Sequence, residues 1–167
     1  MVRNRRVRHT LTIDPGLGGT GWCYWTRLGR SNPTPDGHGV LKAAGRGPWQ
    51  KRATQIVGDF GDLLDRWKIG SACGIVIEFP MVWAGSAKSL SSAERGDLFK
   101  LSYLIGGLGS RVALATGREP RLVTPNEWKG QLPKRVVVQR VEKLTGIAFA
   151  DHEADACGIG MYLIGSL

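Results

Sequence analysis

Alternating and continuous apolar runs in the first half of the chain predict a small sheet followed by a helix. Strands are expected where apolar and polar positions alternate, or where aromatic and β-branched residues gather: residues 7–14, 21–27 and 38–44. The segments PGLGG and SNPTPDG between them are typical of turns and loops. From Trp49 to Lys68 apolar residues recur every three or four positions, which predicts an amphipathic helix.

The second half of the chain adds two strands that alternate with helices. GIVIEF, residues 74–79, is apolar up to Glu78, as expected for a central strand covered on both faces. A short strand over residues 121–124 runs into TPNE, which has the form of a helix capping box with proline in the first turn. Longer helices are predicted over residues 92–115, 134–144 and 152–164.

This order of elements predicts a mixed α/β fold. Three antiparallel strands come first, parallel strands follow through helical crossovers, and helices flank the sheet. We expect one domain over residues 1–167 with a basic arm at residues 1–6, because 167 residues leave no room for a second large core. No run approaches the roughly 18 consecutive apolar residues of a membrane helix, so no membrane partner is expected.

Charge and cysteine content narrow the classes of partner and compartment. The chain has 23 Lys and Arg against 14 Asp and Glu, a net charge of +9, which favours a polyanionic partner such as DNA or RNA. Cys23, Cys73 and Cys157 are widely separated and form no CxxC pair. We therefore predict three buried thiols in a reducing cytoplasm.

Carboxylates occur at three places where a fold of this order would gather them. Asp14 ends the first strand, Glu78 ends the central strand, and residues 151–155, DHEAD, begin the last helix. If the first and fourth strands are neighbours, Asp14 and Glu78 lie side by side, and His152 and Asp155 share one helix face. Taken singly, each acid is more ordinary: a cap, a surface residue or a helix-dipole partner.

Together these side chains suit a divalent cation. Three gathered carboxylates repel one another, and a cation relieves that repulsion. Mg²⁺ prefers oxygen ligands, and two ions about 3.5–4 Å apart activate water and stabilise the charge of a phosphodiester under attack. We expect two Mg²⁺ ions per site, with Mn²⁺ as a substitute.

The same residues carry a family resemblance. IDPGLGGTGW, GIVIEFP and HEADACGIG resemble, in that order, the first, second and last motifs of the RuvC-type Holliday-junction resolvases, which have an RNase H-like fold. The resemblance covers about residues 7–165. It implies that Asp14, Glu78 and Asp155 bind metal. His152 stands where many members have an acid, so it either binds metal or handles protons; Asp151 is a fallback ligand.

The resemblance also implies a way of holding DNA. Lys129 and Lys134 match positions that contact phosphates near the scissile bond, and the family forms homodimers that make paired nicks with 5′-phosphate ends. In such enzymes an aromatic residue after the second acid stacks on a base. Here that position is Met81, flanked by Phe79 and Trp83, so the chain departs from the pattern. We expect Trp83 to stack.

Four functional hypotheses follow. The first is a cytoplasmic endonuclease, bacterial or phage-encoded, that resolves four-way junctions. The second is an RNase H-like nuclease acting on other branched DNA or on RNA–DNA hybrids. The third, an actin-like ATPase, would need two such domains and a second phosphate loop. The fourth is a DNA-binding module without catalysis, and the three acids argue against it.

Overall fold

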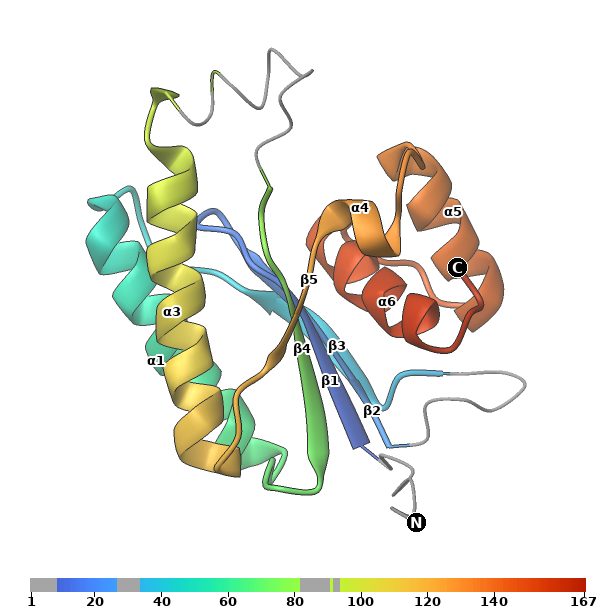
Figure 1. The fold of residues 1–167 in the computed structure, drawn as a ribbon, viewed down its shortest axis with the longest axis horizontal. Helices are drawn as coiled ribbons and strands as arrows, with labels where there is room; N and C mark the ends of the chain where they lie inside the picture. Colours follow the sequence, from blue (N-terminus) through green and yellow to red (C-terminus); the bar gives the residue numbers. More distant parts are fainter. Residues whose placement is uncertain (1–8, 27–33, 82–90, 92–93) are drawn as a thin grey trace.

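A five-stranded mixed sheet runs through the centre of the structure, with helices on both faces (Figure 1). The computed structural model describes residues 9–26, 34–81, 91 and 94–167. The strands are β1 (His9–Asp14), β2 (Thr20–Trp25), β3 (Gly37–Leu41), β4 (Cys73–Glu78) and β5 (Arg121–Val123). The helices are α1 (Trp49–Arg66), α3 (Asp97–Thr116), α4 (Pro125–Trp128), α5 (Lys134–Thr145) and α6 (Asp151–Leu163). The basic arm and Trp83 lie outside the described residues.

The strand order β3-β2-β1-β4-β5 confirms the predicted fold class. β2 pairs antiparallel with both β1 and β3, whereas β4 pairs parallel with both β1 and β5. α1 and α3 lie on one face of the sheet. On the other face α6 packs against the strands, and α4 and α5 pack on α6 (Figure 1). Each face therefore has its own apolar core, as a central strand apolar on both sides requires.

The predicted helix bounds hold to within two residues except at the start of α3. That helix was expected from Ser92 and begins at Asp97. The residue before it, Gly96, has a left-handed backbone (φ 71°), which a continuous right-handed helix does not contain. On α1 the expected apolar stripe is buried, with Ile56 and Phe60 fully inside.

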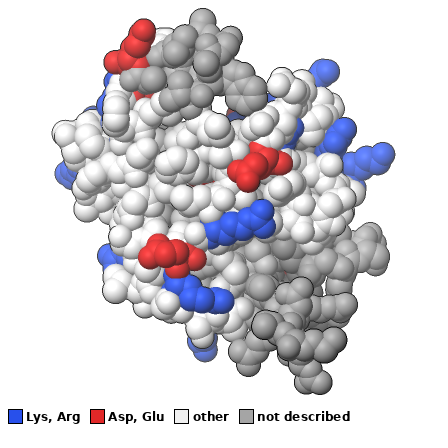
Figure 2. Space-filling model, viewed as in Figure 1, with Lys and Arg blue, Asp and Glu red and all other residues white. Residues whose placement is uncertain are grey.

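α3 has an outward face with few charges. No charged residue lies between Lys100 and Arg111, and Phe99, Tyr103 and Leu114 are 78%, 56% and 82% exposed. Uncharged atoms dominate the left side of Figure 2, where α3 lies in Figure 1. Within the described part of the chain, α3 alone is long and apolar enough to cross a membrane by length and composition. One such helix is weak evidence for a membrane, because helices that pack on a sheet pass the same test.

α6 lies unusually close to β1 and β2. A Cβ on Gly21 of β2 would overlap the carbonyl oxygen of His152, so a glycine is needed where the first turn of α6 crosses this strand. One turn further on, the buried Thr12 hydroxyl of β1 donates a 2.6 Å hydrogen bond to the carbonyl of Ala156. Trp25 packs beside this contact, and a Cβ on Gly160 would lie 2.7 Å from its ring.

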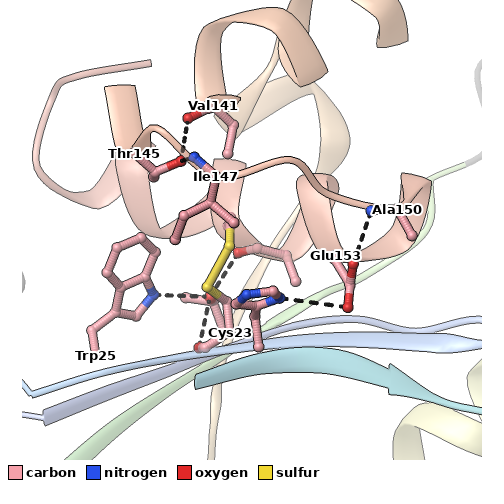
Figure 3. Close-up of a disulfide and its surroundings, with 11 residues drawn as sticks. Cys23, Trp25, Val141, Thr145, Ile147, Ala150 and Glu153 are labelled. Carbon is pink, nitrogen blue, oxygen red and sulfur yellow. Dashed lines mark hydrogen bonds and ion pairs between the residues drawn. A yellow bond between two sulfur atoms is a disulfide. The ribbon is translucent and has the colours of Figure 1, made fainter. Parts of the chain in front are cut away.

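A disulfide joins the same two elements. Cys23 of β2 and Cys157 of α6 are bonded through their sulfurs and are fully buried, with Cα atoms 5.4 Å apart (Figure 3). The prediction of three thiols was therefore wrong for this pair and holds for the buried Cys73. The residues are 134 apart in sequence, and their proximity depends on the packing of α6.

We expect alkylation of the denatured, unreduced protein to modify one cysteine of three. Cys73 carries the free thiol, and Cys23 and Cys157 are protected by their bond. Intact-mass spectrometry after iodoacetamide treatment counts the modified residues, and prior reduction should raise the count to three. Three modified residues without reduction would show that the bond is not formed.

Candidate metal centre

Asp14 and Glu78 end neighbouring parallel strands. The register pairs Ile13 of β1 with Ile77 of β4, so the next residue on each strand, Asp14 and Glu78, lies at the same edge. Side chains alternate between the faces of a sheet. Ile13 and Ile77 point into the core under α1 and α3, whereas Val76 belongs to the core under α6. Both carboxylates are therefore on the face that α6 covers.

The first two turns of α6 bring His152 and Asp155 to this edge. His152 Nδ1 lies 2.7 Å from Asp14 Oδ2, a hydrogen bond between residues 138 apart in sequence. The imidazole also lies against the PGLGG turn, because a Cβ on Gly16 would be 3.3 Å from its Cε1. The Asp155 side chain is 8% exposed and the His152 side chain 41%. The structure thus brings all four predicted ligands to one edge of the sheet.

Two lysines approach the carboxylates from the α4–α5 region. Lys129 Nζ lies 3.8 Å from Glu78 Oε2. Lys134 Nζ, in the first turn of α5, lies 3.4 Å from Asp155 Oδ2 and 3.5 Å from Asp151 Oδ2. Both lysines predicted to contact phosphate therefore border the acidic cluster.

The four side chains do not form a closed coordination shell. Among the described residues, no three His, Cys, Asp or Glu side chains are arranged closely enough to hold a metal ion as they stand. Instead each carboxylate has a basic partner: Glu78 pairs with Lys129, Asp14 with His152, and Asp155 with Lys134. Within the described part of the chain, Asp155 Oδ1 is buried without a hydrogen-bond partner. A buried, unpaired carboxylate oxygen is costly, and it suits a cation.

The electrostatics of the cluster point the same way. Burial, reinforced by the Asp14 carboxylate, raises the pKa of Glu78 from 4.5 to about 7, although Lys129 opposes the shift. Burial also raises the pKa of Asp155, with Lys129 opposing and Asp14 adding to it. The hydrogen bond that the imidazole donates to the Asp14 carboxylate raises the pKa of His152. Burial and mutual repulsion thus disfavour the ionised carboxylates, and a bound divalent cation would stabilise them.

These residues fit the predicted ion by their chemistry. Three carboxylates and one imidazole, partly desolvated and mutually repelling, match the oxygen-rich donor set that Mg²⁺ and Mn²⁺ take in proteins. His152 offers Nε2, because its Nδ1 is already engaged by Asp14. Asp14, Glu78, Asp155 and His152 are the residues that would hold the metal.

The other predicted site residues lie further out. The Asp151 side chain is 76% exposed and pairs with Lys134, which makes it a poorer ligand than Asp155. Glu153 caps α6, because its Oε2 accepts a hydrogen bond from the Ala150 amide (Figure 3). Met81, three residues beyond Glu78, is 50% exposed. Phe79 packs against the core, and Trp83 lies outside the described residues.

One neighbour of the cluster was missed from the sequence. Trp128 is buried and its indole nitrogen donates to Glu78 Oε2 at 2.5 Å. The predictions for the motif NEWKG named Lys129 and did not include the tryptophan before it. An aromatic residue that also carries an N–H donor, one position before a predicted phosphate-contacting lysine, is the signal that could have found it.

The fold is that of RuvC. The chain superposes on Thermus thermophilus RuvC in complex with a Holliday junction substrate with a TM-score of 0.69 and 19% identity, covering 92% of this chain and 90% of that one. A second Thermus thermophilus RuvC structure gives a TM-score of 0.67 at 19% identity, covering 92% of both chains. No protein-family model and no curated protein matches the chain by sequence. The chain therefore has an RNase H-like fold of the RuvC type.

We expect Glu78→Gln to stabilise the metal-free protein at pH 8. The folded-state pKa of Glu78, about 7, lies above its ordinary value of 4.5. Ionisation of Glu78 therefore does not lower the free energy of unfolding below pH 4.5, and lowers it most above pH 7. The neutral amide removes that cost and its oxygen still accepts from Trp128. The gain should be on the order of 1–3 kcal/mol, seen as a higher Tm in EDTA.

The same variant should gain much less at pH 5, where the wild-type Glu78 keeps its proton in the folded state. Glu119→Gln, on an exposed side chain away from the cluster, is the matched control and should change Tm little at either pH. An unchanged or lower Tm for Glu78→Gln at pH 8 would contradict the electrostatic account of the cluster.

Proposed function

We propose that this chain is a metal-dependent endonuclease that cuts branched DNA. One observation carries the proposal: Asp14, Glu78 and Asp155, far apart in sequence, meet at one edge of a RuvC-type sheet with an imidazole and two lysines around them. Acidic clusters of this kind hold the Mg²⁺ ions of phosphodiester hydrolysis. A module that only binds DNA would be weakened by this cluster, because carboxylates repel the DNA phosphates.

Each residue of the cluster has a separate role. Two Mg²⁺ ions, or Mn²⁺ in their place, would lower the pKa of an attacking water and offset charge on the phosphate. Asp14, Glu78 and Asp155 hold them, and His152 completes the set or takes a proton through Nε2. Lys129 and Lys134 place positive charge beside the carboxylates, where a DNA phosphate would bind.

The proposed substrate is a four-way junction, cut by paired nicks that leave 5′-phosphate ends. Three things support this choice: the net charge of +9, the fold shared with a protein solved on a Holliday junction, and the exposed Met81 beyond Glu78. Met81, together with Trp83, is proposed to contact bases at the crossover. Other branched DNA and RNA–DNA hybrids remain the second candidate class.

We expect Asp14→Asn to abolish cleavage and to leave junction binding within about twofold of wild type. The amide keeps the size of the side chain but removes a negative ligand, so the rate should fall about 100-fold or more. Labelled four-way, three-way and RNA–DNA hybrid substrates, with Mg²⁺ or with EDTA, report cleavage and the position of every nick. Gel shift in EDTA reports binding.

Asp65→Asn, on the exposed surface of α1, is the control and should cut like wild type. Symmetric nicks on the four-way junction favour the first substrate class, and preferential cutting of hybrids favours the second. Cleavage by Asp14→Asn at the wild-type rate would remove Asp14 from the site, and failure of the wild type to cut any of these substrates would refute the nuclease.

We further propose that the chain acts as a homodimer through α3. Its exposed stripe recurs every three or four residues and runs Phe99, Tyr103, Gly106, Ser110, Leu114. Small residues at the centre and large apolar residues at the ends suit a second copy of the same helix, crossing about a two-fold axis. A two-fold dimer matches the symmetry of a four-way junction, and its two metal centres would each act on one of two DNA strands.

Phe99→Glu should convert a dimer into a monomer, because the charge would be buried at the contact. Size-exclusion chromatography with light scattering should show half the wild-type mass. Leu144→Glu, also an exposed apolar residue but on α5, should remain dimeric. A wild-type protein that is monomeric at every concentration tested would exclude this dimer.

A further inference from the structure

The indole of Trp128 connects three elements around the metal centre. Its ring is buried in the core formed with α5 and α6, and its Nε1 donates a 2.5 Å hydrogen bond to Glu78 Oε2 on β4. Lys129 Nζ lies 4.6 Å from the centre of the same ring and 3.8 Å from the same carboxylate oxygen. One side chain thus contacts a proposed metal ligand and a proposed phosphate-binding lysine.

The local sequence holds the backbone of Trp128 in place. Val123 of β5 pairs with Glu78 in the sheet, and the chain turns directly into α4. Thr124 caps that helix: its hydroxyl accepts from the Glu127 amide, and Glu127 Oε2 accepts from the Thr124 amide at 2.7 Å. α4 is four residues long, so Trp128 closes it one turn after the strand that pairs with Glu78.

A glycine on α6 makes room for the ring. A Cβ on Gly158 would lie 2.6 Å from Trp128 Cζ3 and 3.3 Å from Val137 Cγ1 of α5. Gly158 follows Asp155 by three residues, so the ring packs against the same helix that carries Asp155 and His152. The indole therefore extends from the carboxylate of β4 to the helix that carries the other ligands.

We infer that Trp128 is a positioning residue, which orients the Glu78 carboxylate for metal binding and sets its distance from α6. The inference rests on the proposed function. Glutamate has a long side chain with several rotamers, and a hydrogen bond at one oxygen selects among them while leaving other lone pairs free for a cation. Partners behind a metal ligand commonly alter metal affinity in this way. A purely structural Trp128 would need the ring but not its N–H.

Trp128→Phe separates those two roles, because phenylalanine keeps an aromatic ring and loses the donor. Trp67→Phe is the control: Trp67 also packs against a glycine, Gly37, but it belongs to the core on the opposite face of the sheet from α6. Calorimetric titration with MgCl₂ alone, without DNA, measures affinity. We expect Mg²⁺ binding to be about tenfold or more weaker in Trp128→Phe, and within about twofold of wild type in Trp67→Phe.

A ¹H–¹⁵N spectrum of the indole groups gives a readout independent of catalysis. One of the six tryptophan N–H resonances should be absent in Trp128→Phe. In the wild type it should move when MgCl₂ is added, and it should also differ in Glu78→Gln. If Trp128→Phe fails to fold, the positioning role is tested by the Glu78→Gln spectrum and by the MgCl₂ titration of the wild type.

The outcomes separate the two proposals. If the wild type binds Mg²⁺ but Trp128→Phe binds it equally well, or no indole resonance responds to Mg²⁺ or to Glu78→Gln, the positioning role is wrong and the nuclease stands. If the wild type binds no Mg²⁺, both proposals fall together. Weaker binding in Trp128→Phe alone, with a responsive indole resonance, supports both.

Discussion

The close packing of α6 on β1 and β2 is the constraint from which the site follows. Gly21 lets the first turn of the helix approach the β2 backbone, the Thr12 hydroxyl holds the Ala156 carbonyl, and a disulfide at Cys157 ties the next turn to the sheet. Because these contacts fix the start of α6, His152 and Asp155 reach the strand ends where Asp14 and Glu78 lie. A helix packed a few ångströms further out would leave four separate polar side chains.

The charge of the carboxylates at this edge lowers the stability of the folded protein. Burial and mutual repulsion raise the pKa of Glu78 to about 7, and burial raises that of Asp155. The chain offsets part of this cost with Lys129, Lys134 and the imidazole of His152. A cation bound at the cluster would free both lysines for a phosphate, so the groups that balance the metal-free site are also those suited to hold DNA.

Patterns that are local in sequence predicted the order of the sheet and the meeting of Asp14, Glu78 and the start of α6 at one edge. β4 reads as a buried strand ending in an acid, and a parallel neighbour then places Asp14 beside Glu78 without knowledge of any side-chain contact. Contacts between residues far apart in the chain could not be predicted from the sequence. The disulfide needs α6 seated on β2, and the Trp128 hydrogen bond needs α4 folded back over β4. α3 was predicted to begin too early. The left-handed backbone of Gly96 prevents an earlier start, and the spacing of apolar residues carries no information about it.

The most direct test of this account is a crystal structure of the protein soaked in Mn²⁺, read by anomalous diffraction. Manganese scatters anomalously, so its position is found without assuming any ligand. The account predicts at least one strong peak in contact with carboxylate oxygens of Asp14, Glu78 and Asp155 together. Manganese found only elsewhere, or bound to Asp151 while the other three keep their lysine and histidine partners, would contradict it.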